Sequence, residues 1–346
     1  MDTKLYNFNI ELSWNLLNKL SQIDRFDASW STLEKVEKHN LNSLKSIATI
    51  QSVGSSTRIE GSKMNDDQVK VLLDKIEISN FEDRDSQEVA GYYNVLNIIL
   101  NDPKNIRVSK SDIKNLHNQL LKFSEKDNWH KGEYKQHSNA VEANFPDGSK
   151  QVIFKTTEPG FATDDEMNSV INWFNNNSEI HNLLKISAFI YEFLTIHPFQ
   201  DGNGRLSRLL TSLMLLKSNY VWIQYVSFEH EIEFRKKEYY NCLRNCQAQR
   251  PNENISEWVN FFLDSLLNLK QKLNKKLEVK DKSGKLAPRE KSIFIYIMSN
   301  PGCKSGEIST KLDIPNPTIK RILSKMVKQE LIEKFGSGSG TNYAIR

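Results

Sequence analysis

The chain of 346 residues has little of three things: cysteine, helix-breaking residues and long apolar runs. Three cysteines (Cys242, Cys246 and Cys303) cannot build a disulfide framework, and residues 1–11 lack the pattern of a secretory signal, so we expect a reducing, cytoplasmic location. Only 14 glycines and 9 prolines interrupt the chain, which favours a mostly α-helical fold. No apolar run approaches the roughly 20 residues that span a bilayer, so we expect no membrane partner.

The formal net charge of +4 conceals an uneven distribution. Residues 270–346 contain 17 Lys and Arg against 7 Asp and Glu, a net charge of +10, which leaves −6 for the rest of the chain. A basic tail on a mildly acidic body indicates a nucleic-acid partner at one end only.

The periodicity of apolar residues predicts an all-α body with one exception. Residues 130–157 contain Gly132, an Asp147-Gly148 turn and the alternating run 151–155, which together predict a small β-hairpin. Helical patterns occupy residues 4–60, 64–76, 86–100, 109–123, 163–177, 183–196, 204–218, 230–247 and 255–275.

The chain changes character after residue 270. We expect residues 271–287, which are rich in lysine, to continue a helix and then become a linker. Residues 288–346 hold three short helical patterns and then two strands around a Gly/Ser turn, as in a winged helix-turn-helix. Its third helix would expose basic side chains that suit DNA phosphates, although a protein-binding module is the alternative. These side chains are Lys320, Arg321, Lys325 and Lys328.

One segment, HPFQDGNGRLSR at residues 197–208, lies between two apolar helical patterns. Gly202 and Gly204 allow tight, positive-φ backbone at the start of the second helix. This backbone would expose N–H groups around Asn203 at a helix N-terminus, where an anion binds favourably.

Four side chains of this segment are suited to phosphate chemistry. Arg205 and Arg208 are three residues apart on a helix, so both guanidinium groups can face one anion. Asp201 offers the hard oxygen that Mg²⁺ prefers, and His197 can act as a general base near neutral pH. The spacing fits neither GxxxxGK[ST] nor a strand-borne GxGxxG. The segment therefore predicts a polyphosphate site equipped for attack on a nucleotide.

The same segment is similar, at every specified position, to the signature HxFx(D/E)GNGRxxR of the Fic family. The resemblance implies a helical Fic core over residues 84–270 that transfers AMP from ATP to a Ser, Thr or Tyr hydroxyl of a target protein or of the chain itself. By this resemblance, His197 deprotonates the hydroxyl, Asp201 holds Mg²⁺ and Phe199 anchors the loop in the core. The phosphates would contact Gly202, Asn203 and Gly204, with the α- and β-phosphates on Arg205 and the γ-phosphate on Arg208.

The predicted hairpin lies where the flap of the family would be, and the flap pairs with an extended segment of the target. We expect the edge of the flap that pairs with the target to consist of Ile153, Phe154, Lys155 and Thr156. The resemblance also makes Tyr239 and Tyr240 candidates for an adenosine pocket, with ordinary core packing as the alternative. Gln247 stands where relatives often have Asn.

Upstream, Ser56 and Glu60 fit the pattern (S/T)xxxE(G/N) and share one face of a predicted helix. They resemble the inhibitory helix of Fic proteins, here about residues 41–61 within an N-terminal region of residues 1–83. A carboxylate beside Arg208 would form a charge-assisted pair in the place of the γ-phosphate. ATP would then bind in a pose unsuited to in-line attack, so we expect Glu60 to restrain the enzyme.

Two alternatives remain open. The same glutamate positions water in some relatives, so the reaction could be de-AMPylation, or transfer of another phosphate-bearing group. A different class is a transcriptional regulator in which the Fic domain only senses nucleotide and the winged helix binds DNA. The target protein and the oligomeric state, a homodimer included, are not determined by the sequence.

Overall fold

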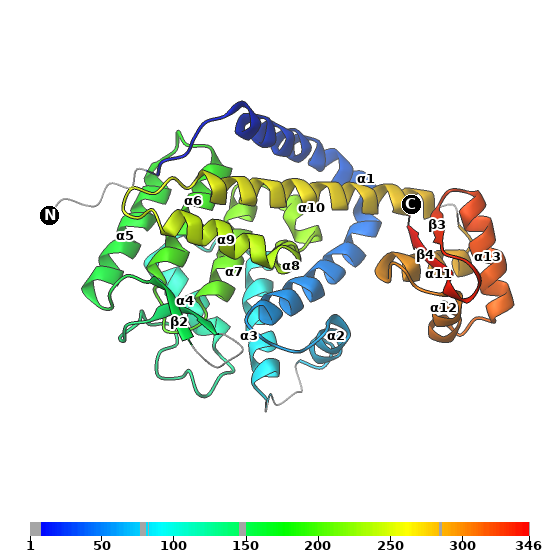
Figure 1. Cartoon of the computed structure of the whole chain (residues 1–346), viewed down its shortest axis with the longest axis horizontal. Coiled ribbons are helices and arrows are strands. Elements are labelled where there is room, and N and C mark those ends of the chain that lie inside the picture. Colours follow the sequence, from blue (N-terminus) through cyan, green and yellow to red (C-terminus); the bar gives the residue numbers. More distant parts are fainter. Residues whose placement is uncertain (1–7, 77–80, 82, 145–149, 284–285, 346) are drawn as a thin grey trace. The chain divides into compact units, whose positions relative to one another are not determined.

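The computed structural model describes residues 8–76, 81, 83–144, 150–283 and 286–345. The chain divides into two compact units, Met1–Lys270 and Gln271–Arg346. Helices dominate the described residues, and each unit adds one two-stranded sheet (Figure 1). The predicted all-α class with a small hairpin is confirmed. Within the described ranges, no helix combines the length and the apolar character needed to cross a membrane.

The helices of the first unit begin mostly where the sequence offers a capping side chain. Ser13, Asp83 and Ser109 each accept a hydrogen bond from a backbone N–H in the first turn that follows. The helices are α1 (Trp14–Ile59), α2 (Asp66–Leu73), α3 (Arg84–Asn101), α4 (Lys110–Leu120), α5 (Phe161–Asn176), α6 (Asn182–Ile196), α7 (Asn203–Lys217), the 3-10 helix η1 (Val221–Tyr225), α8 (Phe228–Phe234), α9 (Lys236–Gln247) and α10 (Ser256–Ser283).

Two helix boundaries differ from the prediction. The segment of about 41–61 is not a separate helix, because α1 runs unbroken for 46 residues and residues 1–53 contain no Gly or Pro to interrupt it. Residues 230–247 form two helices, since Arg235 leaves helical geometry between α8 and α9. No glycine or proline marks that break, so apolar periodicity alone could not locate it.

The centre of the first unit is the pair of helices α6 and α7. Both are buried along almost their whole length; α6 is apolar on nearly every side, whereas α7 also buries polar residues such as Arg205 and Arg208. Helix α7 also packs against α3, η1, α1, α4 and α8. The loop that connects α6 to α7, residues 197–202, is therefore held from several sides.

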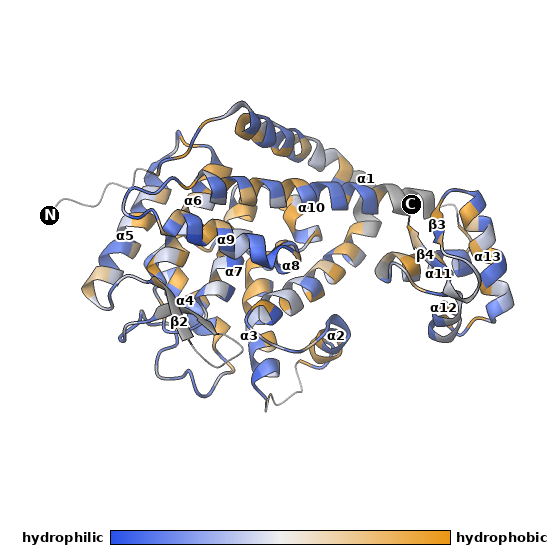
Figure 2. Cartoon of the chain, in the orientation of Figure 1, coloured by the Kyte–Doolittle hydropathy of each residue, from blue (hydrophilic) through white to orange (hydrophobic). Residues whose placement is uncertain are grey.

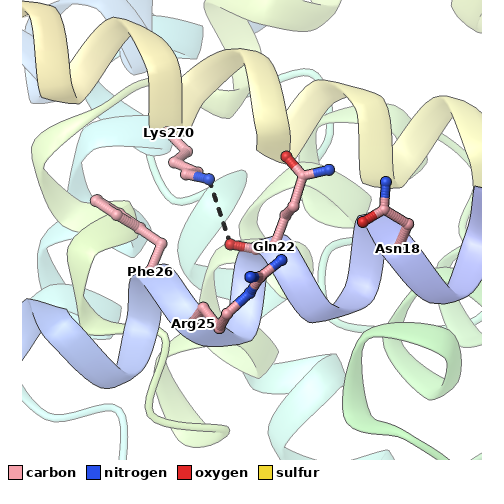
Figure 3. A pocket seen from close by; sticks show the side chains of 5 residues that line it. All are labelled: Asn18, Gln22, Arg25, Phe26 and Lys270. Atoms are coloured by element: carbon pink, nitrogen blue, oxygen red, sulfur yellow. Dashed lines mark hydrogen bonds between the residues drawn. The ribbon is translucent and has the colours of Figure 1, made fainter.

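Helix α10 carries both hydrophilic and hydrophobic residues along its length (Figure 2). Lys270 Nζ donates to the Gln22 carbonyl oxygen over 3.3 Å, which links α10 to α1. A shallow hollow of about 490 Å³ lies beside this contact (Figure 3). It is lined by Asn18, Gln22, Arg25, Phe26 and Lys270.

The predicted hairpin consists of β1 (Ala140–Asn144) and β2 (Lys150–Lys155), which pair antiparallel with Ala140 opposite Lys155. The predicted Asp147-Gly148 turn lies outside the described residues. No third strand pairs with the hairpin among the residues that the structure covers.

The second unit is built as its sequence predicts, with three helices followed by a hairpin. Its core contains the apolar face of the third helix, including Ile319, Leu323 and Met326. Most of the expected linker is helical, because α10 continues to Ser283. The further elements are α11 (Pro288–Ser299), α12 (Ser305–Leu312), α13 (Asn316–Lys328), β3 (Ile332–Phe335), the 3-10 helix η2 (Gly338–Gly340) and β4 (Asn342–Ile345), with β3 antiparallel to β4.

Candidate active site

His197 closes α6 in an unusual backbone conformation. Its φ of 53° lies in the left-handed region, which non-glycine residues rarely adopt. Its Nδ1–H donates to the Leu194 carbonyl oxygen over 3.4 Å, which leaves Nε2 as the basic nitrogen of the ring.

The His197 ring is neutral at physiological pH. Burial and then the nearby positive charge of Lys135 lower its pKa to about 4, against smaller opposing effects of Glu60 and Asp201. A neutral imidazole can accept a proton, so His197 is chemically able to serve as a base.

Phe199 and Asn203 hold the loop in shape. Phe199 is fully buried and stacks on the His117 ring, with ring centroids 3.8 Å apart. The Asn203 side chain accepts from the Phe199 N–H over 2.9 Å and donates to the Phe199 carbonyl oxygen over 2.7 Å. The expected anchor role of Phe199 thus has a geometric basis, whereas the Asn203 amide is already engaged inside the loop.

His117, which the sequence did not single out, fixes the next part of the loop. Its Nδ1 accepts from the Gly132 N–H over 2.9 Å, so its Nε2–H donates to the Asp201 carbonyl oxygen over 2.9 Å. Burial lowers the pKa of His117 to about 4, which keeps it in this neutral form. Motif analysis could not find this role, because His117 lies 80 residues or more before the loop in the sequence.

The N-terminus of α7 places a glycine N-cap and a buried arginine close together. Gly202 adopts a φ of 80° at its N-cap, as predicted, whereas Gly204 lies within α7 and, against the prediction, has no positive φ. Arg205 is 2% exposed, and its Nε and Nη1 find no hydrogen-bond partner among the described residues. Its nearest acids are Glu88, 3.6 Å from Nη1, and Asp201, 3.4 Å from Nη2. A buried guanidinium with unfilled N–H groups indicates a place for an anionic ligand.

Arg208 is held by the C-terminal end of α1. Its Nε donates to Ser56 Oγ over 2.8 Å, and its Nη2 donates to Glu60 Oε1 over 2.7 Å. Burial opposes the charge of Glu60, yet Arg208 lowers the pKa of this carboxyl below its usual value. Gly204 permits the approach, because a Cβ there would lie 2.5 Å from Glu60 Oε1. Glu60 therefore contacts Arg208 as expected, and Ser56 contacts it as well.

His197, Arg208 and Glu60 line one pocket of about 320 Å³ between the loop, the end of α1 and helix α9, whereas Arg205 and Ser56 are not part of its lining. Tyr239 and Tyr240 both line it, although Tyr239 also packs against Trp258 and Phe261, as a core residue does. Gln247 lines it as well, and its Nε2 donates to Thr195 Oγ1 over 3.1 Å. The lining is Glu60, Leu194, His197, Gln200, Asp201, Gly202, Asn203, Gly204, Arg208, Tyr239, Tyr240, Leu243, Arg244 and Gln247.

Arg244 is a further cation in the pocket that the sequence analysis missed. Its guanidinium carbon lies 5.6 Å from the centre of the Tyr240 ring, one turn earlier on α9. The spacing of Tyr240 and Arg244 on one helix was the available signal.

Asp201 is the one carboxylate of the loop that could hold a metal ion. Its Oδ1 accepts from the Gly202 N–H over 2.6 Å, and although burial opposes this, Arg205 lowers its pKa. The described residues contain no group of three or more His, Cys, Asp or Glu arranged to hold a metal. Asp201 thus fits Mg²⁺ as a single protein carboxylate that shares the ion with phosphate oxygens of a substrate.

The flap residues differ in their surroundings. Phe154 is half-buried, and Lys155 is exposed and pairs with Glu158 over 2.9 Å. Thr156 follows β2 and is 4% exposed, so its side chain faces inward and not toward an open edge. Residue 153 lies in β2, and its side chain is outside the described set.

Comparison with known proteins agrees with this architecture. Residues 107–215 match the Fic/DOC family, and residues 286–333 match the winged helix-turn-helix DNA-binding domains. The chain is 26% identical over 210 residues to the protein adenylyltransferase Fic of Aedes aegypti, covering 58% of this chain and 39% of that protein. It is 30% identical over 111 residues to a probable protein adenylyltransferase of Aquifex aeolicus, covering 30% of this chain and 32% of that protein. The matches thus span about two fifths or less of these relatives.

Solved structures extend the likeness to the fold. A Fic family protein from Desulfovibrio desulfuricans G20 is similar over 99% of this chain and 98% of its own, with a TM-score of 0.64 and 20% identity. Fic-1 from C. elegans is similar over 78% of this chain and 73% of its own, with a TM-score of 0.57 and 17% identity. The fold and the loop thus define a mostly helical protein with a core similar to that of Fic proteins. The match to the Fic/DOC family covers residues 107–215, and the C-terminal unit contains the residues that match the winged helix-turn-helix domains.

Proposed function

We propose that this protein transfers AMP from ATP to a hydroxyl side chain of a protein. The observation that carries the proposal is the buried Arg205, whose two unfilled N–H groups lie at the same helix N-terminus that forms a pocket with His197. This arrangement supports binding of a polyphosphate next to a base. The curated relatives are named protein adenylyltransferases, which favours AMP over other phosphate-bearing groups.

In the proposed reaction, His197 Nε2 takes the proton of the target hydroxyl. The hydroxyl oxygen attacks the α-phosphorus, a bond from oxygen to AMP forms, and the bond to the β-phosphate breaks to release pyrophosphate. The N–H groups at the start of α7 and the Arg205 guanidinium stabilise the charge on the transferred group. Mg²⁺ held by Asp201 and the phosphates would supply further charge neutralisation.

We propose further that Glu60 restrains this reaction. Its carboxylate occupies Arg208, the group that we assign to the γ-phosphate, and it lines the pocket itself. With Arg208 engaged, ATP cannot place its γ-phosphate there, and a misaligned α-phosphate reacts more slowly by orders of magnitude. The part of β2 with the half-buried Phe154 and the exposed Lys155 is the segment that we assign to binding the target.

The test uses Glu60→Gly protein, a cell lysate and ATP labelled on either the α- or the γ-phosphate. Protein label from α-labelled ATP that exceeds the level with Glu60→Gly/His197→Ala, with no such excess from γ-labelled ATP, supports AMP transfer. Loss of label from pre-labelled proteins on addition of the wild type would instead support de-AMPylation. Label from γ-labelled ATP that exceeds the level with the double variant would contradict AMP transfer.

A second candidate function is DNA binding by the second unit. Helix α13 exposes Lys320, Arg321 and Lys328 on the side opposite its apolar core face, as groove-entering helices do. Lys325 is committed to Glu290, 2.6 Å away. If binding to duplex DNA depended on nucleotide while no AMP transfer occurred, a nucleotide-sensing regulator would be the better assignment.

A further inference from the structure

Lys135 is a buried lysine for which the proposed chemistry has no use. It is 1% exposed, and its Nζ donates to Asn139 Oδ1 over 2.9 Å, Thr156 Oγ1 over 2.8 Å and the Ile196 carbonyl oxygen over 3.0 Å. An ammonium has three protons, so all of its donors are used. Burying this charge is costly, and three acceptors from separate parts of the chain offset that cost.

The backbone of Lys135 makes a second contact with the same loop. Its N–H donates to the Pro198 carbonyl oxygen over 2.8 Å. One residue therefore holds the carbonyl groups on both sides of His197, at Ile196 and Pro198. A non-glycine residue in left-handed geometry persists only where its surroundings enforce it, and Lys135 supplies that enforcement.

The third contact reaches the base of the flap. Thr156 directly follows β2, and its hydroxyl accepts from Lys135 while donating to the Asn139 carbonyl oxygen over 2.8 Å. The Asn139 amide in turn donates to the Phe199 carbonyl oxygen over 2.9 Å. The flap and the His197 loop thus share Lys135 and Asn139 as a common hub.

We propose that Lys135 is a positioning residue that ties the base of the flap to the backbone on both sides of His197. The hydroxyl presented at the flap and the imidazole that receives its proton are then held at a fixed separation. The inference rests on the proposed function, because it takes His197 as the base and β2 as the segment that binds the target.

The charges around Lys135 and His197 allow the positioning role of Lys135 to be tested by titrating His197. Lys135 is, after burial, the main cause of the low pKa of His197, whereas Glu60 and Asp201 act in the opposite direction. Glu158 and Glu166 face Lys135 itself, whose pKa burial lowers to about 8. Removing the Lys135 charge should therefore raise the pKa of His197, but not to its ordinary 6.5, because burial remains.

The experiment compares Lys135→Met and Lys135→Arg in the full-length Glu60→Gly protein. Misplacing the base or the flap by about 1 Å costs about 100-fold in rate, so Lys135→Met should lose about 100-fold of AMP transfer. Lys135→Arg keeps the charge and should recover most of it. NMR of the histidine rings, with His197 assigned from its absence in His197→Ala, should show a raised His197 pKa in Lys135→Met and not in Lys135→Arg.

Hydrogen exchange adds a readout that needs no activity. Amides of residues 150–157 should exchange faster in Lys135→Met, and also in Thr156→Val, which keeps the lysine charge and hence an unchanged His197 pKa. The positioning role is overturned if Lys135→Met leaves both the His197 pKa and the exchange rates of these amides unchanged. If Lys135→Met does not fold, the role is overturned when Thr156→Val leaves the exchange rates unchanged. If both readouts move but the Glu60→Gly parent transfers no AMP, the positioning stands and the proposed function fails.

Discussion

At the scale of single residues, the site depends on two buried arginines in different states. Arg208 has a carboxylate partner from another element, Glu60, whereas Arg205 has N–H groups that no described residue fills. Buried N–H groups without an acceptor are costly, so Arg205, with only the longer contacts to Glu88 and Asp201, still favours an anion at its Nε and Nη1. Glu60 supplies the anion at Arg208, and we propose that ATP supplies the one at Arg205.

Comparing substitutions of Glu60 should show how much of the inhibition comes from the negative charge of its carboxylate. Glu60→Gln keeps an oxygen for Arg208 but loses the charge assistance, a difference of about 1.4 kcal/mol or roughly tenfold. We therefore expect Glu60→Gln to transfer AMP roughly tenfold faster than the wild type and more slowly than Glu60→Gly, as measured by initial rates. Equal rates for Glu60→Gln and the wild type would show that shape, not charge, restrains the enzyme.

Replacing Glu60 by glycine should also lower the stability of the protein. Without Glu60, Arg208 keeps only its bonds to Ser56, and we expect Glu60→Gly to lose about 1–3 kcal/mol of unfolding free energy. ATP should restore more stability to Glu60→Gly than to the wild type, since Arg208 is then open to phosphate. Thermal unfolding with and without Mg-ATP measures both effects, and equal ATP shifts in the two proteins would contradict the competition.

Protonation of the His197 ring should set the acidic side of the pH–rate profile. Because its pKa is lowered to about 4, the base stays neutral above that pH and is lost as the pH falls through about 4. The negative charge of Glu60 favours protonation of His197, so removing Glu60 should not shift the acidic side of the pH–rate profile to higher pH. The kcat/KM of Glu60→Gly should therefore vary little between pH 5 and 7. A half-maximal point near pH 6.5 would indicate an unperturbed histidine.

At the scale of secondary-structure elements, the end of α1 is fastened to its neighbours beside Glu60. Arg58 donates to both carboxylate oxygens of Glu233 on α8, over 2.7 and 3.0 Å, and to Asp66 of α2 over 2.9 Å. Lys236 Nζ donates to the Ile59 carbonyl oxygen over 2.7 Å. These contacts hold the residue that follows, Glu60, in the pocket.

Weakening this attachment should release Glu60 in part. We expect Glu233→Ala to raise AMP transfer above the wild type, but less than Glu60→Gly does, because Asp66 and Lys236 still hold the helix end. Asp264→Ala is the matched control, since it removes an ion pair of α1 with Lys19, far along the helix from Glu60. If both variants label proteins at the same rate, the attachment has no part in the restraint.

The same scale shows what the sequence could and could not reveal. The loop at 197–208 was predictable because its groups are adjacent in the chain, and the Glu60 pattern because a helix places residues 56 and 60 on one face. Lys135 and His117 act on that loop from more than 60 residues away, and neither carries a motif of its own. Apolar periodicity located the helices but not the break at Arg235, which no glycine or proline marks.

At the scale of the whole molecule, charge separates the two units. We propose that the mildly acidic body binds ATP through the local groups at the N-terminus of α7, and that the basic tail attracts DNA through its overall field. The family matches divide the chain in the same way, with Fic/DOC at residues 107–215 and winged helix-turn-helix DNA-binding domains at residues 286–333.

DNA binding should depend on the exposed face of α13. Replacing Lys320, Arg321 and Lys328 by Ala removes three cations, which should lower the slope of log affinity against log salt by about 2.7 if all three contact phosphates. The control replaces Lys70, Lys104 and Lys237, exposed lysines of the first unit, and should leave the slope unchanged. Absence of duplex binding by the wild type at low salt would exclude this function.

The central claim is that the protein transfers AMP with His197 as the base and that Glu60 holds the transfer back. It is tested most directly by the initial rate of protein labelling from α-labelled ATP, measured side by side for the wild type, Glu60→Gly and Glu60→Gly/His197→Ala. We expect Glu60→Gly to label at least about tenfold faster than the wild type, given the orders of magnitude that misalignment costs, and the double variant not to label at all. Equal rates for the wild type and Glu60→Gly, or labelling that survives the loss of His197, would contradict it.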